Sequence, residues 1–197
     1  MENILSILIW LPVIGMVAIG FIPRAKEELI RITAAVTTGI QFLLTLFLWG
    51  DFDSNNGSMQ FREWAEWIPS FNIAYHLGVD GLSLPMVILT GMLFFIGVFV
   101  SWNIKKAVKG YFALFLMLNT GVMGVFLSLD FFLFYIFWEV MLLPMYFLIG
   151  MWGGPQREYA AIKFFLYTLF GSVLMLVHCR PLVHPNDAFR CRRTIAQ

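Results

Sequence analysis

One carboxylate stands alone inside a long apolar stretch of this chain. From Phe131 to Gly150, the sequence FFLFYIFWEVMLLPMYFLIG carries a single charged side chain, that of Glu139. At about 1.5 Å per residue, this stretch would form a helix about 30 Å long, which matches the hydrocarbon thickness of a bilayer. Glu139 lies eight residues into the stretch, so we expect it near the middle of the membrane.

A charged side chain at that depth is costly, so such residues usually face the interior of a helix bundle and serve a transport pathway. Pro144 has no N–H, and the carbonyl of Val140 therefore loses its helical partner one residue from Glu139. Water could order around that free acceptor. We interpret Glu139 as a functional residue; the alternative is a structural polar residue that hydrogen-bonds a neighbouring helix.

The composition is that of a membrane protein. Hydrophobic residues make up 60% of the chain and charged residues only 13%, whereas a soluble domain has about a quarter charged residues. The net charge of +1 gives no indication of a nucleic-acid partner. The first apolar stretch follows Glu2 and lacks a cleavage site of small residues, so we expect it to remain as an anchor helix.

Six apolar runs are long enough to cross a bilayer as helices. They are Ile4 to Phe21, Ile32 to Trp49, Leu84 to Trp102, Tyr111 to Leu129, Phe131 to Gly150 and Tyr159 to Val177. We therefore expect an all-α polytopic membrane protein with about six transmembrane helices. Pro12 and the glycines at 15, 20, 91 and 97 are tolerated in such helices and predict close packing.

Basic residues alternate between the loops. Arg24, Lys26 and Arg31 crowd the first loop, Lys105, Lys106 and Lys109 the third, and Arg157 and Lys163 the fifth. The long second loop, residues 50–83, has Arg62 as its only basic residue. Because cytoplasmic loops carry the excess of lysine and arginine, the N-terminus is predicted to lie outside.

The long outer loop mixes aromatic and polar residues and is compatible with short strands. Its acids could bind a cation, but their wide spacing favours a solvated surface; they are Asp51, Asp53, Glu63, Glu66 and Asp80. His76 and Asp80 are four apart and could share a proton if that stretch is helical. A helix cap at the start of the third span is the interpretation that we favour.

The sequence changes character after Val177. The tail HCRPLVHPNDAFRCRRTIAQ holds both cysteines of the chain and two of its three histidines. A zinc site is conceivable, but the paired Cys-x2-Cys spacing is lacking; its ligands would be His178, Cys179, His184 and Cys191. The alternative is a tail that is not native, through truncation or a shifted reading frame, and we expect it to be poorly ordered.

Three segments resemble the M-type antiporter-like subunit of respiratory complex I, the proton-pumping NADH:quinone oxidoreductase. They are HLGVDGLSLPMVILTG (76–91), GVFLSLDFFLFYIFWEVMLLPMYFLIGMWGG (124–154) and AAIKFFLYTLFGSVLMLV (160–177). The mitochondrial counterpart is chain 4. The FWE-x-MLLPMY core favours this subunit over its L- and N-type relatives and over the related cation/proton antiporter subunits. The resemblance covers residues 1 to about 177.

In that family, a full subunit resembles two inverted repeats, each with a broken helix and a polar line in mid-membrane. The resemblance implies a partial antiporter-like fold, truncated within the first repeat. Residues 1–129 would hold four transmembrane helices with the outer loop, 130–177 would start the proton-translocating domain, and 178–197 would be a divergent tail.

The resemblance also implies roles for two residues. Glu139 matches the family's acid on the fifth helix, which is thought to pair with a lysine on a seventh helix that this chain lacks. Lys163 matches the lysine of a KFF motif at the start of the sixth helix. Because Lys163 would sit only a turn inside the membrane, a snorkelling or packing role stays open.

The function implied by the resemblance is proton translocation coupled to electron transfer from NADH to quinone. We expect no cofactor in this chain, because it has neither a G-x-G-x-x-G motif nor clustered cysteines. Its expected partners are other membrane-arm subunits and the bilayer, with NADH and quinone bound elsewhere, in a bacterial plasma membrane. Two alternatives are a structural assembly subunit without transport and a cation/proton antiporter subunit.

Overall fold

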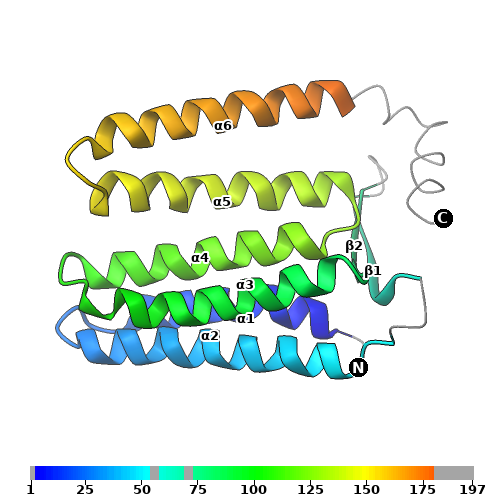
Figure 1. The fold of residues 1–197 in the computed structure, drawn as a ribbon, viewed down its shortest axis with the longest axis horizontal. Helices are drawn as coiled ribbons and strands as arrows, with labels where there is room; N and C mark the ends of the chain where they lie inside the picture. Colours follow the sequence, from blue (N-terminus) through cyan, green and yellow to red (C-terminus); the bar gives the residue numbers. More distant parts are fainter. Residues whose placement is uncertain (1–2, 54–57, 69–72, 180–197) are drawn as a thin grey trace.

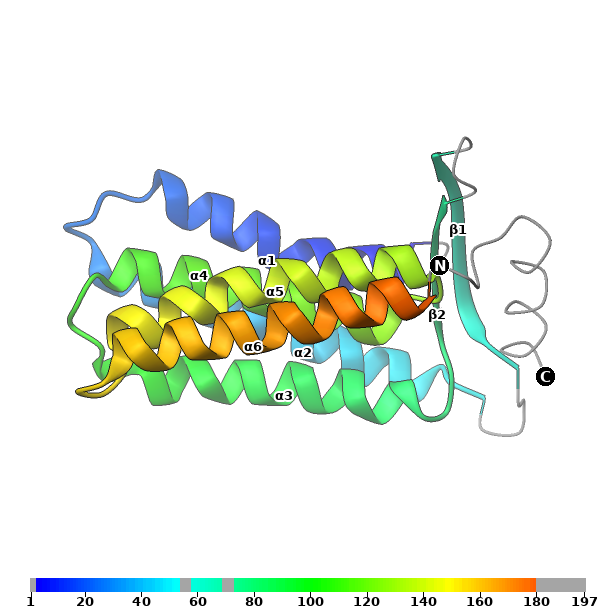
Figure 2. The same cartoon turned by 90° about the horizontal axis from the view of Figure 1, so that it is seen from above.

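A computed structural model of the chain describes residues 3–53, 58–68 and 73–179. Long helices lie side by side in a bundle (Figure 1), and a small sheet lies across one end of it (Figure 2). The helices are α1 (Ile4–Phe21), α2 (Glu27–Gly50), α3 (Ser83–Val100), α4 (Val108–Leu127), α5 (Phe131–Trp152) and α6 (Arg157–Cys179). Each is long and apolar enough to cross a membrane, which confirms the predicted all-α polytopic fold.

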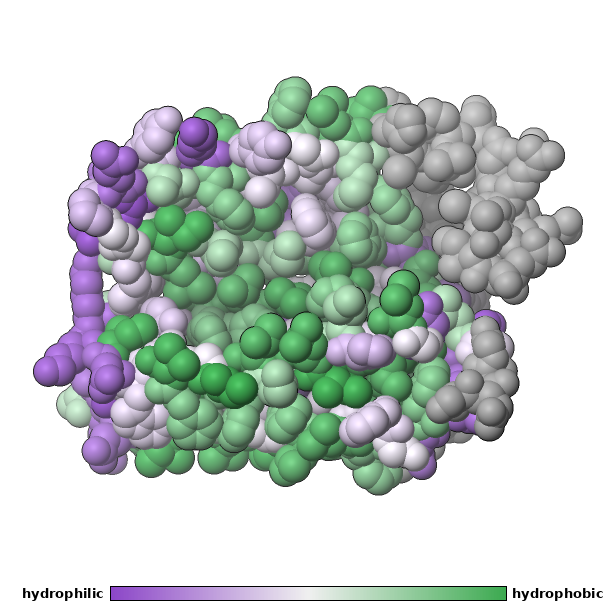
Figure 3. Space-filling view, viewed as in Figure 1, coloured by the Kyte–Doolittle hydropathy of each residue, from purple (hydrophilic) through white to green (hydrophobic). Residues whose placement is uncertain are grey.

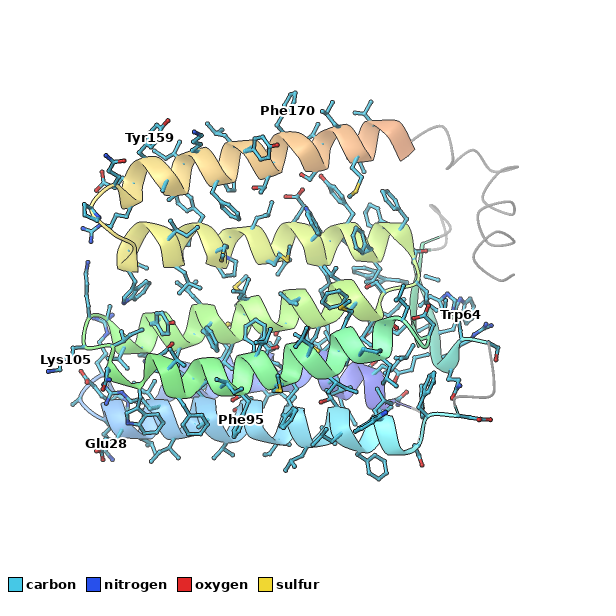
Figure 4. All side chains as sticks on the ribbon, in the orientation of Figure 1. Glu28, Trp64, Phe95, Lys105, Tyr159 and Phe170 are labelled. Atoms are coloured by element: carbon cyan, nitrogen blue, oxygen red, sulfur yellow. The ribbon has the colours of Figure 1, made fainter. Side chains whose placement is uncertain are left out.

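The helix connections alternate between the two ends of the bundle. The α1–α2, α3–α4 and α5–α6 connections lie at one end, and the sheet and the α4–α5 turn lie at the other (Figure 1). Glu28, Lys105 and Tyr159 mark the first end and Trp64 marks the second (Figure 4). The basic loops predicted to share one side of the membrane therefore do share one end of the bundle.

The outer loop forms a hairpin. Strands β1 (Gln60–Ile68) and β2 (Ile73–Val79) pair antiparallel, as the sequence allowed. The hypothesis of a proton shared between His76 and Asp80 required a helix, and it is wrong because His76 lies in β2. Asp80 instead accepts hydrogen bonds from the backbone N–H groups of Leu82, at 3.2 Å, and Ser83, at 2.6 Å, so the favoured cap role is confirmed.

A buried polar pair lies among the helices of the apolar core. Pro12 lacks an N–H, so the carbonyl of Leu8 has no donor from its own helix. The amide Nε2 of Gln41 donates to that carbonyl at 3.0 Å, and Asn119 Nδ2 donates to Gln41 Oε1 at 2.5 Å. Both side chains are fully buried. The Gln41 side chain of α2 thereby replaces the hydrogen bond that the proline removes from α1, and Asn119 of α4 holds Gln41 in place.

Two glycines allow their helices to approach closely. A Cβ atom at Gly15 of α1 would lie 2.6 Å from the hydroxyl oxygen of Thr37 in α2. At Gly124 of α4, it would collide with the ring of Phe137 in α5. Neither position has room for a side chain. Of the glycines predicted to allow close packing, those at 15, 91 and 97 do face a neighbouring helix at short distance, whereas Gly20 has no atom within 4 Å of such a Cβ, so the prediction is wrong there.

The surface has the pattern of a membrane protein. Hydrophobic side chains cover the flank of the bundle, and hydrophilic ones gather toward its ends (Figure 3). Helix α6 lies at the edge of the bundle beside α5 (Figure 1). Many of its large apolar side chains point away from the bundle, as Phe170 shows (Figure 4).

Candidate functional site

Glu139 lies near the middle of α5 and faces α6. Its side chain is partly buried, and its Oε1 atom accepts a hydrogen bond of 2.5 Å from the hydroxyl of Ser172. Ser172 is only 3% exposed. The hydroxyl of Tyr135, one helical turn before Glu139, interacts with both of these side chains. The carboxylate is thus surrounded by hydroxyl groups in an otherwise apolar part of the bundle.

The start of α5 is fixed by its local sequence. The Asp130 carboxylate accepts hydrogen bonds from the backbone N–H groups of Phe132, at 2.8 Å, and Leu133, at 3.3 Å. The N–H of Leu129 donates to the carbonyl of His76 in β2 at 2.9 Å. The cap and the contact with the hairpin together place the first turn of α5 at the sheet end of the bundle.

The register between α5 and α6 places Ser172 opposite Glu139. The helices are antiparallel (Figure 1), and Tyr146 packs against Phe165 with ring centroids 5.5 Å apart. One turn further along α5, Gly150 approaches Ala161. Because the helices are antiparallel, going back along α5 from Tyr146 to Glu139 corresponds to going forward along α6 by the same number of residues from Phe165. This places Ser172 opposite Glu139.

Helix α5 continues through Pro144 without interruption. Pro144 is buried, and its missing N–H still leaves the carbonyl of Val140 without a helical donor. The carbonyl of Val140 is therefore a free acceptor beside Glu139, although the helix itself is not broken there.

The structure does not bring Lys163 and Glu139 together. Lys163 is exposed and its Nζ atom lies 5.7 Å from the centroid of the Tyr159 ring. It precedes Ser172 by nine residues, so it is displaced by about 14 Å along the helix from the level of Glu139. The role of Lys163 in translocation stays a prediction, and the contact with Tyr159 suits a side chain near the membrane surface.

Sequence reasoning missed Ser172 and Tyr135 as partners of Glu139. Tyr135 could have been found, because residues four apart on a helix are neighbours. Ser172 lies 33 residues away in the chain, and its hydroxyl gives no periodic signal. Only the pairing of α5 with α6 identifies it.

The acids of the outer loop were predicted to lie on a solvated surface, and for Glu63 this prediction is wrong. It is only 7% exposed, and its carboxylate accepts hydrogen bonds from the backbone N–H of Leu5, at 2.7 Å, and of Ser6, at 3.1 Å. The Ser6 hydroxyl donates to the same carboxylate. This acid therefore caps the first turn of α1, where a negative charge is favoured.

Basic side chains at the opposite end stabilise helix ends. Lys109 donates to the carbonyls of Gly20, at 2.7 Å, and Ile22, at 2.9 Å, just where α1 ends. Lys106 donates to the carbonyl of Met151 in the last turn of α5 at 3.2 Å. These lysines therefore satisfy carbonyls that a helix leaves unpaired at its C-terminus.

No metal site is found in the described part of the chain, where no three potential ligands from histidine, cysteine and the acids cluster. The outer-loop acids described there therefore do not form a cation site of that kind. Of the four candidate zinc ligands, His184 and Cys191 lie outside the described residues. The side chains of His178 and Cys179 lie outside the description as well.

The chain is similar to a class of membrane protein, the antiporter-like subunits. Residues 128–188 match the family described as NADH:quinone oxidoreductase/Mrp antiporter, transmembrane. The chain superposes on a chain of respiratory complex I from Thermus thermophilus with a TM-score of 0.74 and 26% identity, over 88% of this chain and 34% of that one. An archaeal membrane-bound sulfane sulfur reductase gives a TM-score of 0.73 at 19% identity, which shows the same fold.

Curated relatives point to one subunit within this class. NADH-quinone oxidoreductase subunit M of Rhodobacter capsulatus is 42% identical over 181 residues, which cover 90% of this chain and 35% of the relative. NADH-ubiquinone oxidoreductase chain 4 of Arabidopsis thaliana is 44% identical over 175 residues, with 88% and 35% covered. The chain therefore resembles subunit M, and it spans about a third of the length of these relatives.

Proposed function

We propose that this chain forms part of a membrane-arm subunit of proton-pumping NADH:quinone oxidoreductase, in which Glu139 carries a proton through the middle of the membrane. The observation that carries the proposal is the position of Glu139, halfway along a membrane-spanning helix and directed at the next helix. Acids at this depth commonly belong to proton relays.

The chemistry of the proposed step follows from the surroundings of the carboxylate. Removing a carboxylate from water favours its neutral form, and a nearby ammonium favours its ionised form. A lysine that approaches or leaves Glu139 would therefore make it release or take up a proton. The resemblance places that lysine on a seventh helix, which would follow α6.

The electron chemistry would belong to other subunits. Quinone reduction elsewhere in the complex would shift charge along the membrane arm and so move the lysine. The proposed partners of this chain are accordingly other membrane-arm subunits and the lipid bilayer. We also propose a bacterial inner membrane with the N-terminus outside, supported by the basic residues that share one end of the bundle.

The test is Glu139→Gln in the complete subunit, assembled into the complex and reconstituted into vesicles. Glutamine keeps the size and the polarity but cannot release a proton, so proton pumping per NADH oxidised should fall strongly. Glu158→Gln is the matched control, because Glu158 is exposed at the start of α6. Full coupled pumping in Glu139→Gln would refute the proposal.

A second candidate function is structural, and the surface of α6 favours it. Phe170, Leu166 and Val177 are 67%, 59% and 60% exposed, as expected of a face that other membrane helices cover. In this alternative, the helices support assembly without moving protons. Assembled complex with normal pumping in Glu139→Gln would favour it, whereas sodium-dependent transport would indicate the cation/proton antiporter alternative.

A further inference from the structure

The hydroxyl of Ser172 lies between two acceptors. Its Oγ atom is 2.5 Å from Oε1 of Glu139 and 2.9 Å from the backbone carbonyl of Leu169, one turn earlier in α6. A serine hydroxyl has a single proton, so it can donate only one of these two bonds at a time, while its lone pairs can accept another. The geometry therefore contains two alternative hydrogen-bond arrangements.

We propose that Ser172 is a positioning residue that acts as a hydrogen-bond switch, keeping Glu139 paired both with and without its proton. The inference rests on the proposed function of Glu139. When Glu139 is ionised, the Ser172 hydroxyl donates to Oε1. When Glu139 is protonated, its own O–H donates to Oγ of Ser172, and the serine proton rotates to the carbonyl of Leu169.

The proton balance of the switch is simple. The proton that arrives or leaves is the one on the Glu139 carboxyl group, and the O–H bond of Ser172 never breaks. Only the direction of the serine O–H bond changes. The carbonyl of Leu169 can take the extra bond, because a carbonyl oxygen has two lone pairs and its helical partner uses one.

The burial of Ser172 favours such a switch. Ser172 is 3% exposed, so water cannot easily replace a missing partner at its Oγ atom. A buried polar atom without a partner is unfavourable, and a site that paired only one state of Glu139 would hold the acid in that state. With Ser172, both states are paired, and the carboxyl group can accept and release a proton in turn.

Tyr135 completes the group on the α5 side. Its hydroxyl interacts with both Glu139 and Ser172, and it can donate to the ionised carboxylate.

Thr168 provides a contrast one turn before Ser172. Its hydroxyl lies 2.7 Å from the carbonyl of Phe164 and 3.1 Å from that of Phe165, so it is engaged with its own helix. Thr168 is therefore a matched control on the same helix.

The test combines infrared difference spectroscopy with proton pumping in the assembled complex. The C=O stretching band of protonated Glu139 is identified as the band that Glu139→Gln removes. Ser172→Ala should shift this band and lower the rate of proton pumping by about three- to tenfold, the effect of one lost hydrogen bond. Ser172→Thr should restore both, and Thr168→Val should change neither.

The outcomes separate this inference from the proposed function. If Glu139→Gln abolishes pumping but Ser172→Ala leaves the band and the pumping unchanged, the switch is refuted and the role of Glu139 stands. If Ser172→Thr behaves like Ser172→Ala, the hydroxyl is not the active feature, and the switch is again refuted. If Glu139→Gln pumps fully, the proposed function fails, and so does the inference that rests on it.

Discussion

Two acids in this chain are removed from water, and they are held in different ways. Glu63 is bound by backbone N–H groups at the start of α1 and by the hydroxyl of Ser6. Backbone N–H groups can only donate, so the carboxylate of Glu63 is held as a hydrogen-bond acceptor in a fixed structural role. Glu139 is bound by the hydroxyl of Ser172, and a hydroxyl can both donate and accept, so it suits a group that changes its protonation state.

These acids also differ in how far the sequence predicts them. Glu139 is conspicuous because every neighbour within its span is uncharged. Glu63 lies in a polar loop, and its partner Leu5 is 58 residues away, so no local pattern distinguishes it from the acids around it. The distinction comes from the hairpin, which folds the loop back onto the start of α1.

Replacing Glu63 should destabilise the protein. Glu63→Gln removes the negative charge at the first turn of α1 and weakens bonds to buried N–H groups, so the free energy of unfolding should fall by about 1–3 kcal/mol. Thermal unfolding in detergent measures this change. Glu158→Gln, at an exposed position, is the control, and an equal melting temperature for Glu63→Gln and the unchanged protein would contradict the cap.

At the scale of elements, apolar length predicts the helices well. The predicted ends agree with the structure within a few residues, except that α2 begins at Glu27 and not at Ile32. The acids Glu27 and Glu28 shorten the apolar run but suit the first turn of a helix, where the backbone N–H groups are positive. The sequence does not show which helix packs against which. The hydrogen-bond partners of Gln41 and Ser172 could therefore not be predicted from it.

The polar pair that compensates for Pro12 can be tested by a double change. Gln41→Leu leaves the carbonyl of Leu8 and the amide of Asn119 unpaired in the core, so it should lower the free energy of unfolding by about 1–3 kcal/mol. Pro12→Ala restores a backbone N–H toward Leu8 and should recover part of the loss. Thermal unfolding of the two single variants and the double variant gives the coupling; strictly additive effects would show that the two sites are independent.

The stability that Asp80 contributes at the start of α3 should depend on pH. Burial raises the pKa of Asp80, but its hydrogen bonds with Ser83 and with the N–H of Leu82 together outweigh burial and hold the pKa below its usual value of 3.8. The ionised form is therefore favoured by folding. The stabilisation is present above about pH 4 and is lost as the pH falls through the lowered pKa.

Comparison with Asp80→Asn measures this contribution. The stability advantage of the unchanged protein over the variant should be constant near neutral pH and shrink below about pH 4. Acid-induced unfolding followed by circular dichroism gives both curves. An advantage that grew on acidification would show that the sign of the pKa shift is wrong.

The described part of the chain has two regions with different kinds of polar contact. At the sheet end and in the first four helices, contacts such as those of Glu63, Asp80 and Gln41 cap helix ends or replace a missing hydrogen bond, which is a structural role. At the edge of the bundle, α5 and α6 hold Glu139 beside an apolar face that is exposed in this chain. If Glu139 belongs to a proton path, we expect further helices to pack on that face and bring a cationic side chain toward the carboxylate.

If Glu139 moves protons, its replacement should change the number of protons pumped per electron. In complex carrying the complete subunit, Glu139→Asp keeps an ionisable group and Glu139→Gln does not, while both keep the site polar. We predict that the aspartate variant retains part of the pumping and that the glutamine variant loses most of it at equal levels of assembled complex. An unchanged ratio of protons to electrons in the glutamine variant would contradict the claim.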